Sequence, residues 1–347
     1  MKKNPSIRFN GFTDAWEQRK LGEFADISTG KLDANAMVED GEYDFYTSGM
    51  KKYRIDTPAF EGPAITIAGN GATVGYMHLA DGEFNAYQRT YVLQNFQANR
   101  YFLYSEISKK LPRKIAQEAR TGNIPYIVMD MLTELTISLP VLEEEQAKIG
   151  AFFKQLDNTI ALHQRKLEKS KALKSAYLSE MFPVEGERKP KRRFAGFTDD
   201  WEQRKLGSIY QFQYGHFNNN PDNGGIYPIY GANGIIGGYH GFNAENSVVI
   251  GHMGAYAGHV LWVEGKHFVT YNGTIGFPKD LNFDRKFGFH MLQHINIPKI
   301  TAGSGQPFVS YSDLENIKLY ISDSIDEQNK LGYFFDMLEN TIALHQR

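Results

Sequence analysis

Apolar residues between positions 142 and 181 recur at alternating steps of four and three, the pattern of a long helix with one buried stripe. The stripe consists of Ile149, Phe153, Leu156, Ile160, His163, Leu167, Ser170, Lys174, Tyr177 and Met181, with polar lapses. About 40 residues at 1.5 Å each predict a rod of roughly 60 Å. Pro183 and Gly186 end it. A single helix has no core of its own, so its stripe requires a partner helix.

The chain supplies that partner by repeating itself. Residues 145–165 read EQAKIGAFFKQLDNTIALHQR, and residues 327–347 read EQNKLGYFFDMLENTIALHQR. Residues 8–22 (RFNGFTDAWEQRKLG) and 193–207 (RFAGFTDDWEQRKLG) differ at only two positions. We therefore predict a duplication in which two antiparallel helices hold two globular units at a fixed distance.

The stretches between these near-identical ends have diverged, and only sparse landmarks align. These are Gly71 and Gly75 with Gly254 and Gly258, Phe84, Tyr87 and Thr90 with Phe268, Tyr271 and Thr274, and Pro125 with Pro307. Constant ends with diverged middles indicate one scaffold that presents two different recognition surfaces. Neutral drift of an old duplication is the alternative.

Each middle is expected to be rich in short strands. Segments 64–68, 90–93 and 247–250 have strand composition, and 69–71 and 232–234 carry hairpin-type turn signals. Residues 101–117 have helical spacing, although Pro112 is expected to kink or break the helix.

The predicted fold class is α+β, with two tandem β-rich domains separated by long coiled-coil helices in a pseudo-twofold internal repeat. The predicted segments are a first domain at 1–142, a central spacer helix at 143–183, a linker at 184–192, a second domain at 193–324 and a shortened second spacer helix at 325–347.

Composition restricts the chemistry. The 347 residues contain no cysteine, which excludes disulfides and thiolate metal sites. The N-terminus shows no signal peptide and no stretch reaches 18 apolar residues, so a cytoplasmic protein without membrane contact is expected. Net charge is -2, and only the connector 143–192 is basic, with 11 Lys and Arg against 8 Asp and Glu. A DNA-binding chain with this balance has its cations segregated on one face, or a partner supplies most phosphate contacts.

Catalytic constellations are not apparent in the sequence. The glycine runs 69–75 and 231–238 lack the Gly-Lys-Ser/Thr of a phosphate loop and are interpreted as β-turns. The stretch Asn4-Pro5-Ser6-Ile7 lacks the second proline and the aromatic residue of a methyltransferase loop. Eight of the ten histidines follow residue 200, but without a carboxylate pattern they do not indicate a metal site. We expect no catalytic residues, no metal and no cofactor in this chain.

The segments GFTDAWEQRKLGE at 11–23, GFTDDWEQRKLGS at 196–208 and LDNTIALHQRKLEKSKALKSAYLSEMF at 156–182 resemble the specificity subunits of type I restriction–modification systems. The resemblance covers essentially the whole chain, in the order domain, helix, domain, helix. It implies two target recognition domains that each read half of a bipartite site in double-stranded DNA, with the helices setting the gap.

The resemblance also implies partners: two methyltransferase subunits that dock on the scaffold, and motor–nuclease subunits that join for cleavage. The S-adenosylmethionine and ATP sites of the family lie on those partners. In the family the last helix continues, whereas here the second copy stops at Arg347, the match of Arg165, with no counterpart of Lys166–Met181. The short helix is a truncation, a natural shortened form, or one whose missing part another copy of the chain supplies, and docking of the second methyltransferase is the function that we expect it to affect.

Residues that read bases should be polar, lie in the diverged middles and occupy turns or loops. In the first middle the candidates are Thr47, Ser48, Lys51, Lys52, Tyr53, Arg54, Asn70, Thr73, Gln88, Arg89, Thr121 and Asn123, with Lys109, Lys110, Arg113 and Lys114 as a phosphate-facing cluster. In the second they are His216, Asn218, Asn219, Tyr230, Asn233, His252, Tyr256, Asn272, Ser304 and Gln306. Trp16–Lys20 and Trp201–Lys205 are the same in both copies, so they are scaffold, with the tryptophans expected to pack against the helices.

Two other functions fit parts of the pattern. One is the recognition subunit of a related restriction system that also uses a bipartite site. The other is a tandem β-rich carbohydrate-binding or adhesion protein, which the 20 Tyr and 24 Phe residues would suit. The long heptad helix between the domains argues against that second function, because an adhesin has no need of it.

Overall fold

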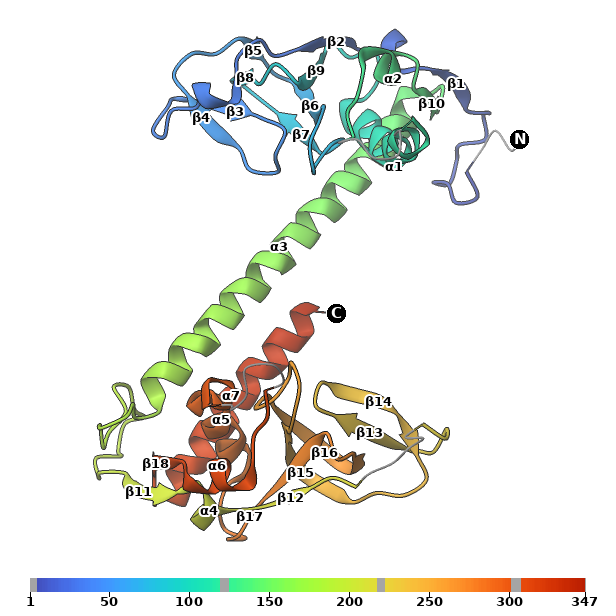
Figure 1. The fold of residues 1–347 in the computed structure, drawn as a ribbon. Coiled ribbons are helices and arrows are strands. Elements are labelled where there is room, and N and C mark those ends of the chain that lie inside the picture. Colours follow the sequence, from blue (N-terminus) through green and yellow to red (C-terminus); the bar gives the residue numbers. More distant parts are fainter. Residues whose placement is uncertain (1–4, 119–124, 217–221, 301–306, 347) are drawn as a thin grey trace. The chain divides into compact units, whose positions relative to one another are not determined.

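The computed structural model describes residues 5–118, 125–216, 222–300 and 307–346. The chain divides into two units, Met1–Ala161 (unit 1) and Leu162–Arg347 (unit 2), which we describe separately (Figure 1). The helix α3, Glu143–Met181, begins in unit 1 and ends in unit 2. The long helix between two domains is thus confirmed. None of the helices in the described residues combines the length and apolar character that a bilayer crossing requires.

Unit 1 contains two four-stranded sheets. The first has the order β2-β9-β6-β7, formed by Asp26–Thr29, Thr90–Gln94, Ala64–Ala68 and Met77–Ala80. The second has the order β4-β3-β8-β5, formed by Tyr53–Ile55, Tyr43–Tyr46, Glu83–Ala86 and Phe60–Glu61. Short 3-10 turns, η1 (Leu21–Glu23) and η2 (Ala34–Ala36), lie between strands.

Helix α1 (Arg100–Glu118) covers the first sheet of unit 1. Its residues Leu103, Ile107 and Leu111 are fully buried in the same core as Ile65 and Ile67 of β6. Of the two outcomes predicted at Pro112, a kink or a break, the break is wrong, because the helix continues through Pro112 to Glu118. The apolar stripe on both sides of the proline holds the segment in place, which offsets the loss of one backbone hydrogen bond.

Unit 2 contains one six-stranded sheet with the order β12-β17-β15-β16-β13-β14. Its strands are Tyr210–Tyr214, Gly273–Pro278, Ala244–Gly251, Val260–Val269, Tyr227–Gly231 and Gly234–Tyr239. The ten-residue β16 pairs with both β15 and β13, whereas in unit 1 two separate strands, β7 and β8, do so with β6 and β3. The remaining elements before α7 are α4 (Leu206–Ile209), α5 (Arg285–Ile295), η3 (Ile297–Ile300) and α6 (Tyr311–Asn316).

Glycines at equivalent turns explain two of the sequence landmarks. Gly71 and Gly75 in unit 1 have φ values of 85° and 83°, and Gly254 and Gly258 in unit 2 have values of 82° and 81°. This left-handed backbone disfavours residues with a Cβ. Both glycine runs interpreted as β-turns belong to hairpins: 69–76 connects β6 to β7, and 232–233 connects β13 to β14.

The near-identical ends of the repeat form one module that occurs in both units. In unit 1, β1 (Glu17–Lys20) pairs with β10 (Thr136–Leu139), and in unit 2, β11 (Glu202–Lys205) pairs with β18 (Lys318–Ile321). Each module then leads into a long helix, α3 or α7 (Ile325–Gln346).

A buried ion pair fastens each module to the first turn of its helix. Arg8 holds Glu145 with two hydrogen bonds of 2.5 and 2.7 Å, and Arg193 holds Glu327 with two of 2.5 and 2.8 Å. The glutamate side chains are 1% and 0% exposed. The hydrogen bonds to Glu327 raise the pKa of Arg193. These pairs give a structural reason for the identity of the repeat ends.

The repeated tryptophans of the two modules, Trp16 and Trp201, pack against helices. Trp201 is 2% exposed; its ring meets Phe287 of α5 and its Nε1 donates to Glu327 of α7 at 3.1 Å. Trp16 packs edge-on against Phe102 of α1. The scaffold role predicted for these residues fits these contacts.

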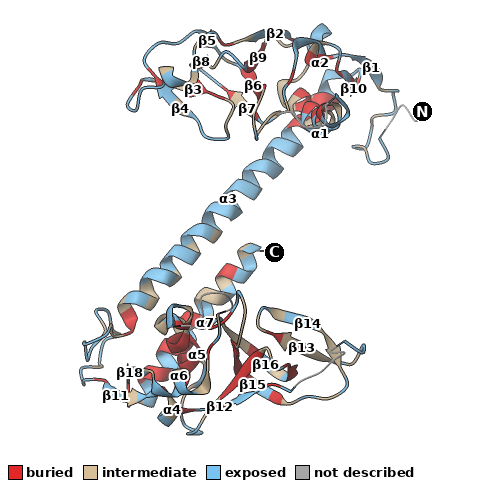
Figure 2. Cartoon of the chain, in the orientation of Figure 1, coloured by how far each residue is buried: buried red, intermediate tan, exposed pale blue. Residues whose placement is uncertain are grey.

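Within unit 2 the last part of α3 runs antiparallel to α7. Nδ1 of His163 lies 3.2 Å from Nδ1 of His345, and the ring of Tyr177 meets that of Phe334 at 5.1 Å. Residue numbers on α7 therefore fall as those on α3 rise, which is the predicted antiparallel pairing. Much of α3 is exposed, as Figure 2 shows, including Phe153 (41%) and Ile160 (48%).

Candidate nucleic-acid interface

The turn between β8 and β9 carries two of the candidate base-reading residues, Gln88 and Arg89. The backbone N–H of Thr90 donates to the carbonyl of Tyr87 at 2.8 Å and closes the turn. The N–H of Gln88 donates to the carbonyl of Leu32, and the carbonyl of Arg89 accepts from the N–H of Gly69, both at 2.8 Å. The backbone at the tip is fixed on both sides, while the side chains of Gln88 and Arg89 are exposed.

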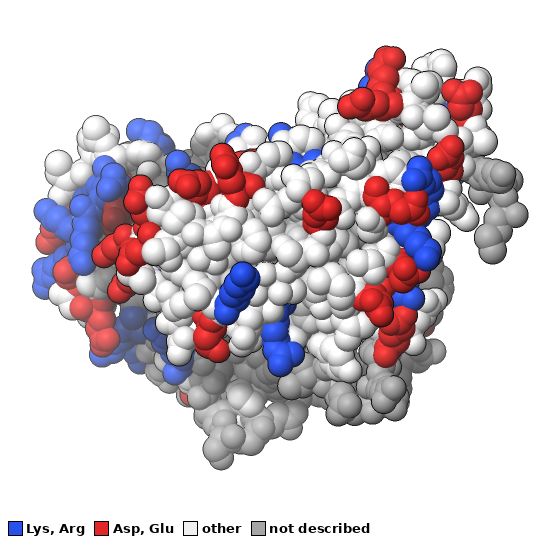
Figure 3. All heavy atoms as spheres, turned by 90° about the horizontal axis from the view of Figure 1, so that it is seen from above, with Lys and Arg blue, Asp and Glu red and all other residues white. Residues whose placement is uncertain are grey.

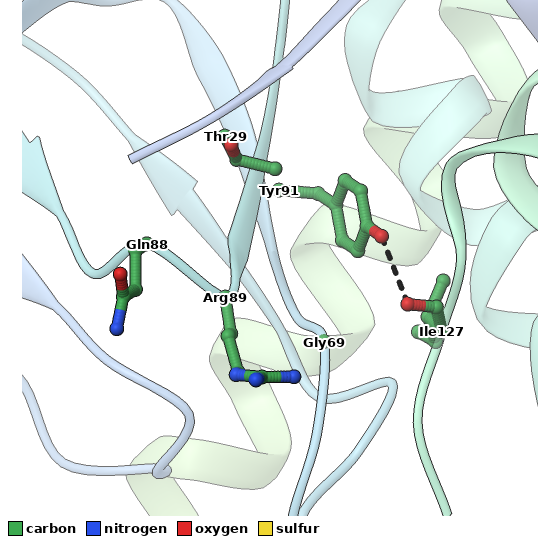
Figure 4. Close-up of a pocket in the computed structure, with 6 residues that line it drawn as sticks. All are labelled: Thr29, Gly69, Gln88, Arg89, Tyr91 and Ile127. Atoms are coloured by element: carbon green, nitrogen blue, oxygen red, sulfur yellow. Dashed lines mark hydrogen bonds between the residues drawn. The ribbon is translucent and has the colours of Figure 1, made fainter. Parts of the chain in front are cut away.

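Arg89 lines a cavity of about 310 Å³ beside this turn (Figure 4). The cavity is lined by Thr29, Gly69, Gln88, Arg89, Tyr91 and Ile127. The hydroxyl of Tyr91 donates to the carbonyl of Ile127 at 2.8 Å, which ties the far wall together. Within the described residues no hydrogen bond or ion pair engages the guanidinium of Arg89. It is therefore available for a planar, bidentate contact.

Three other candidates in unit 1 bond mainly to one another. The hydroxyl of Ser48 lies 2.5 Å from Oδ1 of Asn70, and the hydroxyl of Thr73 donates to the carbonyl of Ser48. Thr47 is 8% exposed and packs in the interior. These contacts hold the loop after β3 against the loop after β6. The candidates Ser48, Asn70 and Thr73, which the sequence analysis predicted as one group, are therefore in contact. Thr47 is better interpreted as part of the packing than as a base contact.

The cations on the hairpin β3–β4 are largely neutralised. Lys52 and Arg54 both pair with Asp44, at 2.8 and 2.7 Å, and Lys51 lies over the ring of Tyr53 at 5.3 Å. Burial raises the pKa of Asp44, but the hydrogen bonds and charges of Lys52 and Arg54 outweigh burial and lower that pKa overall. Two of the predicted DNA-facing cations therefore already have a carboxylate partner.

The phosphate-facing cluster predicted on α1 is also partly occupied. Lys110 pairs with Glu106 at 2.8 Å and donates to the carbonyl of Thr136, and Lys114 pairs with Glu118. Lys109 and Arg113 are exposed and have no such partner among the described residues. Only half of this cluster is thus available without breaking an existing contact.

In unit 2 the equivalent turn carries Tyr271 and Asn272. The N–H of Gly273 donates to the carbonyl of Thr270 at 2.9 Å, and the carbonyl of Asn272 accepts from the N–H of His252 at 2.8 Å. These bonds match those around Thr90, Tyr87 and Arg89 in unit 1. They show that Tyr87 and Thr270 occupy equivalent positions in the two copies of the repeat.

The landmark alignment of Phe84, Tyr87 and Thr90 with Phe268, Tyr271 and Thr274 is therefore wrong by one residue. The β-sheet register gives the same result. Tyr46 pairs with Ala86, and its equivalent Tyr230 pairs with Val269, so Ala86 matches Val269. Phe84, two residues before Ala86, therefore does not match Phe268. Matching aromatic letters suggested the wrong register, since an insertion between the two copies is invisible where side chains have diverged.

Aromatic side chains fill the space beside the turn of unit 2. The ring of Tyr214 lies 4.3 Å from that of His252 and stacks on Tyr311 at 3.9 Å. Nδ1 of His252 lies 2.9 Å from the carbonyl of Val309. Tyr214 and Tyr311 were not among the predicted site residues. The signal that identifies them is their position in the repeat, once the register is known.

The other described candidates of unit 2 differ in how far they are exposed. Asn233 is exposed on the β13–β14 hairpin, and His216 is exposed after β12. Tyr256 is 40% exposed and packs edge-on against His259. Tyr230 is half-buried, and burial raises its pKa. The candidates Thr121, Asn123, Asn218, Asn219, Ser304 and Gln306 lie outside the described residues.

Charge alone does not mark a binding site on the face seen in Figure 3. On the face seen in Figure 3, lysines and arginines are interspersed with aspartates and glutamates around a broad uncharged area. The described residues contain no group of three or more His, Asp or Glu side chains that would hold a metal ion. Hydrogen-bonding and aromatic side chains on fixed turns therefore make up the candidate site.

Comparisons with known proteins give the family context. A family model for the "Type I restriction modification DNA specificity domain" matches residues 13–171 and 198–347. The EcoDI specificity subunit of a type I restriction enzyme from Escherichia coli is 31% identical over 211 residues, 60% of this chain and 46% of that protein. The EcoprrI specificity subunit from the same organism is 31% identical over 127 residues, 34% of this chain and 30% of that protein. The matched regions span less than half the length of both relatives.

A solved structure is also similar. The S subunit of a type I restriction-modification system from M. genitalium superposes with a TM-score of 0.80 and 20% identity, covering 99% of this chain and 94% of that one. At this identity the likeness shows a shared fold and no more.

Proposed function

The chain belongs to the family of type I restriction modification DNA specificity domains, and on that premise we propose that it selects a bipartite sequence in double-stranded DNA. Unit 1 reads one half of the target and unit 2 reads the other. The antiparallel helices α3 and α7 set the length of the gap between them. The chain is the specificity subunit that directs methyltransferase and motor–nuclease subunits to this target.

One observation carries the proposal: the two units keep the same scaffold and change the side chains at the same turn. The pairs Arg8–Glu145 and Arg193–Glu327 are repeated almost atom for atom. At the turn after β8 or β16, however, Gln88 and Arg89 are replaced by Tyr271 and Asn272. Identical residues cannot distinguish two half-sites, whereas different residues on one fixed backbone can.

The chain itself catalyses nothing in this proposal. Two methyltransferase subunits dock on the scaffold and carry the S-adenosylmethionine site, and the motor–nuclease subunits carry the ATP site. The near-neutral charge of the chain supports this division, because partner subunits would then supply a large part of the phosphate contacts.

The test is a base-resolution map of DNA methylation in cells that express this chain with its cognate methyltransferase, compared with cells that lack the chain. We expect a new methylated motif with two short specific halves and a fixed non-specific gap. Absence of a new motif, with the methyltransferase shown to be active beside a different specificity subunit and to co-purify with this chain, would overturn the proposal.

A further inference from the structure

The two units present different chemistry at one equivalent place. Hydrogen bonds identify the place in both: the turn closed by Thr90 and Tyr87 in unit 1 and by Gly273 and Thr270 in unit 2. The matched positions around it are Arg89 and Asn272, Gln88 and Tyr271, Thr29 and Tyr214, and Gly69 and His252.

In unit 1 this place is open and basic. Gly69 and Thr29 are small, so they leave the cavity of about 310 Å³, with the exposed guanidinium of Arg89 at its edge. In unit 2 the rings of Tyr214 and His252 occupy the matched positions and lie 4.3 Å apart. The turn of unit 2 carries the amide of Asn272 and the phenol of Tyr271, where unit 1 has the guanidinium of Arg89.

From this difference we infer that the two half-sites differ in base pair at the position that faces this turn. Arg89 reads the guanine of a G·C pair, with two N–H groups of its guanidinium donating to O6 and N7. Asn272 reads the adenine of an A·T pair, and the ring of Tyr271 packs against the thymine methyl group. This inference rests on the proposed function and deepens it, because it assigns the class of base that each unit selects.

General rules of DNA recognition give these assignments. Arginine pairs bidentately with guanine and asparagine with adenine, while apolar surface contacts the methyl group of thymine. A reader must also be held rigidly, and the backbone of both turns is fixed by hydrogen bonds of 2.8 Å to neighbouring segments of the chain. Lys52 and Arg54 differ from Arg89, since Asp44 already holds them.

A phosphate contact is the other role open to a free arginine. The two roles respond differently to Arg89→Lys, because lysine keeps the charge but loses the planar fork. A lysine at a phosphate contact leaves the motif unchanged, whereas a lysine in place of a guanine reader relaxes one position. Arg113→Ala is the comparison for a phosphate contact, since Arg113 is an exposed arginine of the cluster on α1 that is predicted to face phosphates.

The experiment maps methylation motifs for the complex with wild-type chain, Arg89→Ala, Arg89→Lys, Asn272→Ala and Arg113→Ala. We expect both Arg89 variants to relax a single G·C position in one half, and Asn272→Ala to relax a single A·T position in the other half. Arg113→Ala should leave the motif unchanged. A relaxed position of the opposite pair type, or an unchanged motif in the Arg89 variants, would overturn the inference. A wild-type chain that yields no motif would instead overturn the proposed function.

A variant that abolishes methylation is resolved by competition binding. The assembled complex is offered duplexes that carry the wild-type motif and duplexes changed at one pair. Loss of a single reader should reduce discrimination at its own pair by roughly 10- to 100-fold and leave the other pairs unaffected. Equal weakening for every duplex would contradict base reading by that residue.

Discussion

At the scale of single residues, the buried pair of Arg193 and Glu327 links the start of the second module to helix α7 in unit 2. The side chain of Glu327 is fully buried and also accepts hydrogen bonds from Trp201 and Ser322. Glu327→Ala leaves the guanidinium without its partner in the interior, so we expect the free energy of unfolding to fall by about 3–5 kcal/mol. Urea unfolding of the chain measures this change.

The matched control is Glu180→Ala. Glu180 pairs with Arg192 at 2.6 Å, but both side chains are well exposed. An exposed pair is worth about 0–1 kcal/mol. Equal losses in the two variants would show that burial does not set the strength of the Arg193–Glu327 pair.

A second residue, His267, gives unit 2 a pH dependence. It is fully buried and lies 3.0 Å from the hydroxyl of Ser247. Burial lowers its pKa from 6.5, although a backbone hydrogen bond with Gly265 opposes the shift. The unfolded chain then binds a proton that the folded unit does not bind. Stability is therefore fully present above about pH 6.5 and falls as the pH drops below it.

We expect the melting temperature of the chain to fall between pH 7.5 and 5.5 and the fall to be smaller in His267→Gln. The largest contribution of one histidine is about 1.4 kcal/mol per pH unit. Burial also lowers the pKa of His294, so part of the dependence should remain. The exposed residue His240 provides the control, since His240→Gln should leave the slope unchanged.

At the scale of elements, the same helical stripe has two environments. Phe335 of α7 is 0% exposed and packs against Phe182 and His290, whereas its repeat partner Phe153 of α3 is 41% exposed. Phe335→Ala should cost about 3–5 kcal/mol because it leaves a cavity. Phe153→Ala should cost about 0.5 kcal/mol or less, as for an exposed position. Chemical denaturation of both variants checks the difference, and similar costs would contradict it.

This pair of phenylalanines also shows what the sequence could predict. Periodicity predicted the long helix, and the two pairs of near-identical segments predicted the repeat and the antiparallel partner helix, because these features are visible in the letters that both copies share. Burial of the stripe depends on which segment lies against it, and the letters around Phe153 and Phe335 are nearly the same. The sequence therefore predicted the element but not its environment.

The candidate site was predictable only in part for a related reason. Polar residues in the diverged turns identified Gln88, Arg89 and Asn272, since a turn signal and a polar side chain are both visible in the sequence. Thr47 proved to be buried, and Lys52 and Arg54 proved to be paired, because such contacts come from residues distant in the chain. The repeat register, and with it the role of Tyr214, required the backbone hydrogen bonds.

At the scale of the whole molecule, two features bear on DNA binding: the charge balance of the chain and the helix that connects the two units. Residues 1–142 carry 16 Lys and Arg against 17 Asp and Glu, and residues 193–347 carry 11 against 15. A chain with this balance gains little affinity from phosphates by itself. Under the proposed function, the chain would contribute selectivity and the assembled complex would supply most of the electrostatic attraction.

The connection between the units is the uninterrupted helix α3, and it leads to a prediction about the DNA target. Four residues inserted between Ala161 and Leu162, where the two units meet along the chain, lengthen the helix by about 6 Å. The site lies outside the segment of α3 that pairs with α7, which starts at His163. Each base pair advances the DNA axis by about 3.4 Å. The non-specific gap of the methylated motif should therefore grow by roughly one or two base pairs, with both specific halves unchanged. Four alanines inserted between Gly186 and Glu187, in the linker outside the helix, serve as the control and should leave the gap as it was. A gap that stays constant in the helix variant would mean that α3 does not measure the distance between the half-sites.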